Sequence, residues 1–287
     1  MKVCIIGKGS YIGNHIDNCL SHRNIDVFQL DVLTEDWRNF DFTPYDAIVH
    51  VAGIVHRPDC QDQNLYKRVN TDMPINIAWR YKSSKAQKKT FVFLSTMAVF
   101  GVSKRLNKNV ITAGTPTAPQ GLYAQSKKAA EEGLLPLQSD DFNVVIVRPP
   151  NVYGKDCRGG YISGFAKVAK TLPFIPKAYT SVKQSVLYID NLCELVYQLI
   201  KGDRYGIFMP QDDKAVSAIE IVKAIGAGLD INVRTCRILG VAAHIGSFLP
   251  IIQKAYGGVE YSQELSDFAG ISYRVVPFEE AIKLTVK

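Results

Sequence analysis

Residues 3–20 read VCIIGKGSYIGNHIDNCL, an apolar run that meets three glycines within seven residues and then continues with a helical pattern. The apolar run predicts a buried strand, and the recurrence of Ile12, Ile16 and Leu20 predicts one face of a helix. A glycine turn between a strand and a helix leaves free N–H groups at the helix start, where a pyrophosphate can bind. The spacing G-x-G-x-x-x-G over residues 7–13 therefore favours a dinucleotide site, with a plain strand-helix turn as the alternative.

The first half of the chain repeats this alternation of short apolar runs and helical patterns, which predicts a parallel sheet covered on both faces. The predicted strands are Val3–Ile6, Val27–Leu30, Ala47–Val51, Phe91–Leu94 and Val144–Val147, and the longer predicted helices are 61–81 and 123–137. After Pro149 and Pro150 the signals become shorter and less regular. We expect an α/β fold, with a Rossmann-like doubly wound parallel sheet binding a dinucleotide in 1–155. A smaller substrate-binding region in 156–287 is expected to contribute some elements back to the core domain.

Composition narrows the classes of protein. The six cysteines show no C-x-x-C or Cys/His ligand spacing, which predicts reduced thiols, no metal site and a cytoplasmic protein. The net charge of +7 makes a basic surface, but its lysine clusters are not interleaved with aromatic residues as in single-strand binders. We therefore expect no nucleic-acid partner.

The longest apolar stretch, residues 238–252, is interrupted by polar residues and by Pro250. It falls short of the roughly 18 to 20 uninterrupted apolar residues that span a membrane. The stretch favours a buried helix without integral membrane association. Docking on a membrane surface is the alternative.

Asp31 ends the second predicted strand, 24 residues after Gly7. A carboxylate at this place accepts hydrogen bonds from both ribose hydroxyls and repels a 2′-phosphate, which favours NAD over NADP. The alternative is an acid that caps a turn or helix. Val51, Ala52 and Gly53 end the third predicted strand with small residues, as needed where the backbone approaches a flat ring, and close packing is the alternative reason for them.

Tyr123 and Lys127 are four residues apart, so the phenol and the ammonium share one helix face. The positive charge is expected to favour the phenolate and to lower a pKa that is normally about 10. Thr96, which follows Ser95 at the end of a predicted strand, adds a hydroxyl. Together these groups can move a proton on an alcohol or carbonyl while a nicotinamide moves the hydride.

Six segments carry a family resemblance. They are GKGSYIGNH (7–15, similar to GGSGYIGSH, with Ser10 for the middle glycine), HVAG (50–53, HxAG), VNT (69–71, NVxGT), STMAVFG (95–101, S-[ST]-x-x-V-Y-G), RPPNVYG (148–154, RxxNVYG) and KQSVLYID (183–190, R-D-[FY]-x-x-V-x-D). With them the chain resembles the NAD-dependent sugar epimerase/dehydratase family of the extended short-chain dehydrogenases/reductases. The resemblance runs from residue 2 to about residue 195 and is specific as a set.

The resemblance implies a role for each matching position. The implied catalytic residues are Thr96, Tyr123 and Lys127. The implied cofactor-binding residues are Gly7, Ser10, Tyr11, Ile12, Gly13, Asp31, Val51, Ala52, Gly53, Asn70, Ser95, Tyr123, Lys127 and Pro149. The implied substrate-binding residues are Thr96, Asn151, Arg158, Lys183, Gln184 and Tyr188.

Departures from the family pattern indicate which of the family's reactions to expect. Met97 and Ala98 stand where sugar 4,6-dehydratases carry Asp-Glu, which disfavours dehydration. Gln184 stands where the family carries the arginine that binds the substrate diphosphate, so Lys183 or Arg158 is expected to supply the charge. The segment 31–50 is shorter than in typical epimerases, which predicts a missing or merged helix and strand.

The expected function is a 4-epimerase of the UDP-glucose/UDP-galactose type. It would act on a nucleoside-diphosphate sugar by transient oxidation at C4 with NAD. The alternative is an NAD(P)H-dependent nucleotide-sugar 4-ketoreductase in deoxysugar or surface polysaccharide synthesis, because the same three catalytic residues serve both reactions. A cofactor-sensing regulator is disfavoured because the Tyr-Lys pair is retained. A homodimer is what relatives suggest.

Overall fold

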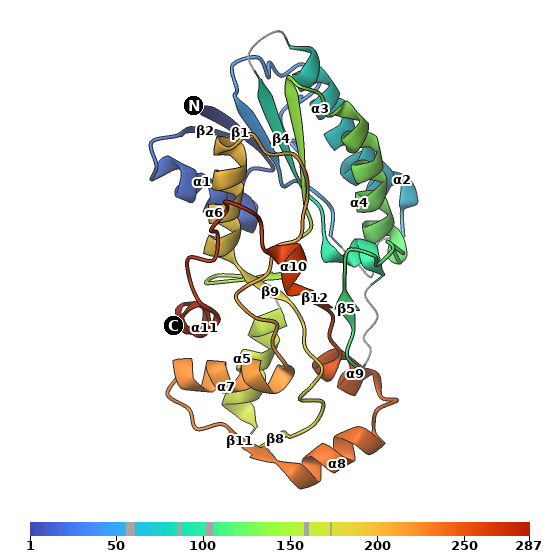
Figure 1. Cartoon of the computed structure of the whole chain (residues 1–287), viewed down its shortest axis with the longest axis vertical. Coiled ribbons are helices and arrows are strands. Elements are labelled where there is room, and N and C mark those ends of the chain that lie inside the picture. Colours follow the sequence, from blue (N-terminus) through green and yellow to red (C-terminus); the bar gives the residue numbers. More distant parts are fainter. Residues whose placement is uncertain (56–60, 85–87, 102–105, 158–160, 173) are drawn as a thin grey trace. The chain divides into compact units, whose positions relative to one another are not determined.

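The computed structural model describes residues 1–55, 61–84, 88–101, 106–157, 161–172 and 174–287. The chain divides into two compact units, and most of their helices and several of their strands are labelled in Figure 1. Unit 1 comprises Met1–Gly101, Thr117–Pro149 and Leu192–Met209, and unit 2 comprises Val102–Pro116, Pro150–Asn191 and Pro210–Lys287.

A six-stranded sheet with parallel neighbours throughout forms the centre of unit 1. Its strands are β1 (Lys2–Ile6), β2 (Asp26–Leu30), β3 (Ala47–His50), β4 (Lys89–Leu94), β6 (Phe142–Val147) and β10 (Gly206–Phe208), in the order β10-β6-β4-β3-β1-β2. The five predicted strands are all present, although the third ends one residue early, at His50. The predicted α/β class and parallel sheet are confirmed.

Helices cover both faces of this sheet (Figure 1). They are α1 (Tyr11–Ser21) and the unit 1 part of α6 (Ile189–Lys201) on one face, and α3 (Met73–Ser83) and α4 (Gly121–Leu134) on the other. Along β1, Cys4 and Ile6 join the core cluster with residues of α3 and α4, while Val3 and Ile5 are buried on the opposite side. Burial on both faces explains why the strands are continuous apolar runs.

The long helix predicted over 61–81 is built from three pieces. They are α2 (Gln63–Tyr66), the π-helical turn η1 (Lys67–Asp72) and α3, which extends to Ser83. The wider π turn contains the buried residues Asn70 and Thr71. Single π turns inside helices often accompany functional sites. The predicted helix 123–137 is α4 followed by the 3₁₀ turn η3 (Leu135–Leu137), and a second 3₁₀ turn, η2 (Met97–Phe100), follows β4.

The connection from β2 to β3 contains no helix or strand in residues 31–46, all of which the structure describes. Strand β2 therefore forms one edge of the sheet. Residues 31–50 are therefore shorter than in typical epimerases because a helix and a strand are missing, not merged.

Unit 2 has three two-stranded parallel sheets instead of one large sheet. Its strands are β5 (Val110–Ile111), β7 (Asn151–Tyr153), β8 (Phe174–Pro176), β9 (Val186–Tyr188), β11 (Arg234–Cys236) and β12 (Glu260–Tyr261). Its helices are α5 (Tyr161–Thr171), α7 (Ala218–Gly228), α8 (Arg237–Ile245), α9 (Pro250–Tyr256), α10 (Gln263–Ser266) and α11 (Phe278–Val286).

A buried carboxylate organises part of unit 2. Asp212 is fully buried and accepts hydrogen bonds from the Tyr188 N–H at 2.9 Å, the Asn191 side-chain amide at 2.9 Å and the Tyr153 hydroxyl at 2.7 Å. Burial raises the pKa of Asp212 to about 6, against the lowering effect of these hydrogen bonds.

The raised pKa predicts a specific pH dependence of stability. Folded protein binds the Asp212 proton more tightly than the unfolded chain does, so this group should destabilise the fold as pH rises from about 4 to about 6. The unfolding free energy of the wild type relative to Asp212→Asn should fall by up to about 3 kcal/mol across that window. Denaturant melts at several pH values measure this difference, with the exposed Asp230→Asn as control. A flat difference between the two proteins would contradict the prediction.

Candidate active site

The glycine turn after β1 has the geometry that the sequence predicted. Gly7 has φ +119° and Gly9 has φ +75°, conformations that favour glycine. A Cβ on Gly7 would lie 2.9 Å from the backbone nitrogen of Ala52, so the turn packs directly on the end of β3. A Cβ on Gly9 would meet no atom within 4 Å. The turn therefore leaves open space beside the start of α1, as a dinucleotide requires.

Ser10 has a defined role at the position of the family's middle glycine. Its φ of −72° is ordinary for any residue, and its hydroxyl accepts a hydrogen bond from the Gly13 N–H at 3.1 Å. Ser10 is thus the N-cap of α1, and a serine at this position stabilises the helix start. A Cβ on Gly13 would lie 2.6 Å from the Ser10 hydroxyl oxygen, so the two residues fit as a pair.

Asp31 performs the alternative role considered from the sequence. Its carboxylate accepts hydrogen bonds from the Leu33 N–H and the Thr34 hydroxyl, each at 2.9 Å, and these bonds lower its pKa. Both oxygens therefore hold the turn after β2. Each oxygen keeps a further lone pair, so contact with a ribose stays a prediction.

Two side chains from other elements lie close against Gly53. A Cβ at this position would lie 3.1 Å from Asn70 Oδ1 and 3.3 Å from Lys127 Nζ. Asn70 accepts from the Ile54 N–H at 2.8 Å, and its amide donates to the Ile54 carbonyl at 2.9 Å and to Ser126 Oγ at 3.1 Å. Asn70 therefore ties the segment after β3 to α4, and the π turn presents it for this contact.

Lys127 lies in the interior of unit 1. Its ammonium donates to the Leu94 carbonyl at 2.8 Å and lies 4.5 Å from the centre of the Phe93 ring. Burial lowers the pKa of Lys127 to about 7, although the nearby Glu131 opposes this shift. The ammonium is thus held at the end of β4, beside the backbone of Gly53.

Tyr123 and Thr96 meet through their side chains. A hydrogen bond joins the Tyr123 phenol to the Thr96 side chain, and Thr96 Oγ1 also accepts from the Ala98 N–H at 3.1 Å as the cap of η2. The sequence predicted a lowered pKa for Tyr123, and this prediction is wrong for the unliganded chain. Burial raises the pKa, and the hydrogen bond from Thr96 only partly opposes it, while the Lys127 ammonium is engaged by Leu94.

A buried ion pair that sequence reasoning missed supports this site. Arg148 donates to Glu131 through Nε at 2.9 Å and Nη2 at 2.6 Å, and the Ser95 hydroxyl donates to Glu131 at 2.5 Å. Glu131 is fully buried on α4, and Arg148 directly follows β6. The pattern Tyr-x-x-x-Lys-x-x-x-Glu places Glu131 on the helix face of Lys127, a signal visible in the sequence. Ser95, predicted to contact the cofactor, has its hydroxyl engaged in this network.

The predicted substrate residues of unit 2 have differing environments. Asn151 is exposed at the start of β7, beside Val186 of β9. Tyr188 is buried at the end of β9, against the ring of Tyr153. Gln184 is buried and hydrogen-bonds the Tyr161 phenol.

Lys183 and Arg158 are the two basic residues expected to replace the diphosphate-binding arginine. The Lys183 ammonium lies 3.8 Å from Glu220, which partly balances its charge. Arg158 lies outside the described residues. The contact of either residue with a diphosphate stays a prediction.

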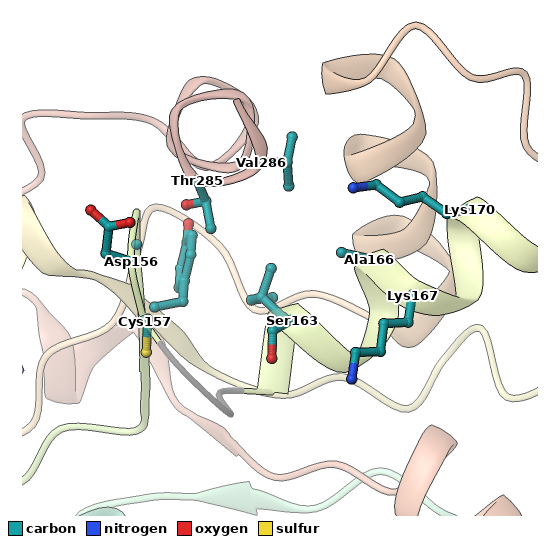
Figure 2. A pocket seen from close by; sticks show the side chains of 11 residues that line it. Asp156, Cys157, Ser163, Ala166, Lys167, Lys170, Thr285 and Val286 are labelled. Atoms are coloured by element: carbon teal, nitrogen blue, oxygen red, sulfur yellow. The ribbon is translucent and has the colours of Figure 1, made fainter.

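Unit 2 also contains a cavity of about 340 Å³ (Figure 2). Its polar lining includes Asp156, Cys157, Ser163, Lys167 and Lys170. None of the substrate residues predicted within the described chain lines it.

The contribution of the buried Glu131–Arg148 ion pair to stability can be tested by substitution. Glu131→Gln removes the charge that balances a buried guanidinium, so it should lower the unfolding free energy by about 3 to 5 kcal/mol. The matched control is Glu132→Gln on the exposed face of the same helix, where loss of the Lys128 pair should change stability by less than about 1 kcal/mol. Equal effects in urea melts would show that the buried pair contributes nothing specific.

One known relative matches this chain in sequence. UDP-glucose 4-epimerase of Vibrio cholerae is 31% identical over 190 residues, which cover 64% of this chain and 57% of that protein. The match thus spans little more than half of that relative's length.

Two solved structures match almost the whole chain. UDP-glucuronic acid 4-epimerase of Bacillus cereus in complex with NAD has a TM-score of 0.75 at 15% identity, covering 100% of this chain and 95% of that one. UDP-glucose 4-epimerase of Thermus thermophilus in complex with NAD has a TM-score of 0.72 at 20% identity, covering 100% and 98%.

A dTDP-4-dehydrorhamnose reductase of Clostridium acetobutylicum matches with a TM-score of 0.65 at 22% identity, covering 83% of this chain and 84% of that one. At such low identities these structures establish the shared fold alone. Residues 3–206 match the sequence model of the NAD dependent epimerase/dehydratase family, which is well over half of the chain. The chain therefore belongs to the NAD dependent epimerase/dehydratase family.

Proposed function

We propose that this protein is an NAD-dependent nucleoside-diphosphate-sugar 4-epimerase of the UDP-glucose/UDP-galactose type. In this proposal unit 1 holds NAD and unit 2 supplies residues that bind the nucleotide sugar. The observation that carries the proposal is the pairing of the Tyr123 phenol with Thr96 in the unit that buries Lys127 against Gly53.

Each of the three side chains has a distinct task. Tyr123 takes the proton from the 4-hydroxyl of the sugar, and Thr96 hydrogen-bonds the same oxygen and keeps the phenol oriented. Lys127 holds the nicotinamide ribose. When bound, oxidised NAD supplies the acceptor for the C4 hydride and a positive charge that favours the phenolate.

The residues around Thr96 support a reaction without elimination of water. Met97 is buried and Ala98 follows it in η2, and neither side chain can donate or accept a proton. Proton transfer is thereby limited to the oxygen that Tyr123 and Thr96 share. This limitation supports epimerisation or ketone reduction over dehydration.

The Tyr123→Phe variant tests the proton transfer. Loss of the hydroxyl should reduce turnover by about 10²- to 10⁴-fold, because Tyr123 is the proposed proton acceptor, while NAD binding measured by fluorescence quenching should persist. Tyr205→Phe on the exposed surface of the same unit is the control and should keep wild-type turnover. Undiminished turnover of Tyr123→Phe would exclude the assigned base.

Nucleotide-sugar turnover without added NADH separates the epimerase from the 4-ketoreductase alternative. Because an epimerase returns the hydride that it removes, UDP-galactose or UDP-GlcNAc should reach an equilibrium mixture of C4 epimers with constant absorbance at the NADH wavelength. Product analysis by chromatography measures the mixture. Stoichiometric loss of NADH with a 4-keto-6-deoxy nucleotide sugar, and no epimer formed from the 4-hydroxy sugars, would instead favour the reductase.

A further inference from the structure

Helix α8 buries its small residues and exposes its large ones. Its two buried residues are Gly240 and Ala243. On the other side, Ile238, Val241 and Ile245 are 81%, 61% and 74% exposed. The spacings of three and four residues place these three side chains in one stripe along the helix. Amphipathic helices normally bury the large apolar face, so this orientation is the reverse of the usual one.

The close packing of Gly240 fixes this orientation. A Cβ at Gly240 would lie 2.2 Å from the Lys177 carbonyl oxygen, so the helix backbone lies directly on the chain that follows β8. The Lys177 N–H donates to the Cys236 carbonyl at 2.9 Å, which joins the same two segments at the start of α8. Rotation that buried Ile238 or Ile245 would break this contact.

Two further exposed apolar side chains follow α8 closely in the sequence. Phe248, before α9, is 73% exposed, and Ile251, in its first turn, is 72% exposed. We call the five side chains Ile238, Val241, Ile245, Phe248 and Ile251 the apolar ridge. Single exposed apolar residues are common, but five within 14 residues are unusual and favour a surface that binds a partner. Helix α8 lies along the outer edge of unit 2 (Figure 1).

The charges around the apolar ridge specify the partner. Between Asp230 and Glu260 the sequence contains no acidic residue, whereas Arg234, Arg237 and Lys254 are present and exposed. A cavity of about 420 Å³ beside Ile251 has Lys167 and Lys254 among its lining residues. Apolar side chains flanked by cations match an anionic lipid surface. The apolar side chains can pack against acyl chains, and the cations can contact headgroup phosphates.

We propose that the apolar ridge docks this protein on the surface of a membrane that contains anionic phospholipid. The ridge inserts into the boundary between headgroups and acyl chains, and the flanking lysines and arginines contact the phosphates. Helix α8 has nine residues and a length of about 14 Å, too short for a hydrocarbon core of about 30 Å. No helix in the described part of the chain is long and apolar enough to cross a bilayer. The helix is therefore expected to lie in the plane of the interface.

Vesicle sedimentation with the full chain tests this proposal. Wild-type protein should sediment with vesicles of phosphatidylglycerol and phosphatidylcholine in equal parts, and much less with vesicles of phosphatidylcholine alone. The double variant Ile245→Glu/Ile251→Glu should bind the mixed vesicles at least about tenfold more weakly, the effect of losing one buried large apolar side chain. Arg237→Glu/Lys254→Glu should also bind more weakly, by roughly fivefold for each removed cation.

The matched control is Val275→Glu, which adds a charge at a half-exposed apolar residue of the same unit outside the apolar ridge. It should bind the mixed vesicles as the wild type does. Because all substituted side chains are exposed, unchanged thermal melts will show that the variants fold. Absent binding to the mixed vesicles at low salt, or equal binding by Ile245→Glu/Ile251→Glu and the wild type, overturns the proposal. The proposal is also overturned if the wild type forms an oligomer in solution and only the ridge variants dissociate it. The apolar ridge would then be a contact between copies of the chain.

Discussion

The ammonium of Lys127 lies inside unit 1, where a positive charge is costly unless other groups balance it. The Leu94 carbonyl accepts its hydrogen bond, the Phe93 ring faces it, and Glu131 lies one helical turn away. Glu131 is itself balanced by Arg148, which follows β6. One buried charge thus requires the next, and the series joins α4 to the ends of the neighbouring strands β4 and β6. This coupling fixes where the face of α4 that carries Tyr123 and Lys127 lies against the sheet.

Much of this arrangement could be predicted because it depends on local sequence. Burial on both faces makes a parallel strand an apolar run, so β1 and β4 were recognisable without knowledge of their neighbours. Helical periodicity placed Tyr123 and Lys127 on one face. The positive φ of Gly7 is a backbone property that a glycine indicates. The reason for Gly53 was predicted only in part, because its small size serves Asn70 and Lys127 directly.

Other features depend on contacts between distant segments and could not be deduced from the sequence alone. The π turn around Asn70 follows from the fit of that side chain between Ile54 and Ser126, which lie in different parts of the chain. The pairing of Lys183 with Glu220 likewise joins two segments of unit 2. Strand β10 returns to the sheet of unit 1 after a long excursion through unit 2, and its three residues carry a weak strand signal.

Burial has opposite consequences for the pKa values of Tyr123 and Lys127. It lowers the pKa of Lys127 and raises that of Tyr123, so in the unliganded chain both groups are shifted toward their neutral forms. A phenol that stays protonated cannot act as a base. Under the proposed function, the charge that favours the phenolate has to arrive with the ligands, in the space beside the glycine turn. The same burial that holds the side chains in place would thereby confine proton abstraction to the loaded site.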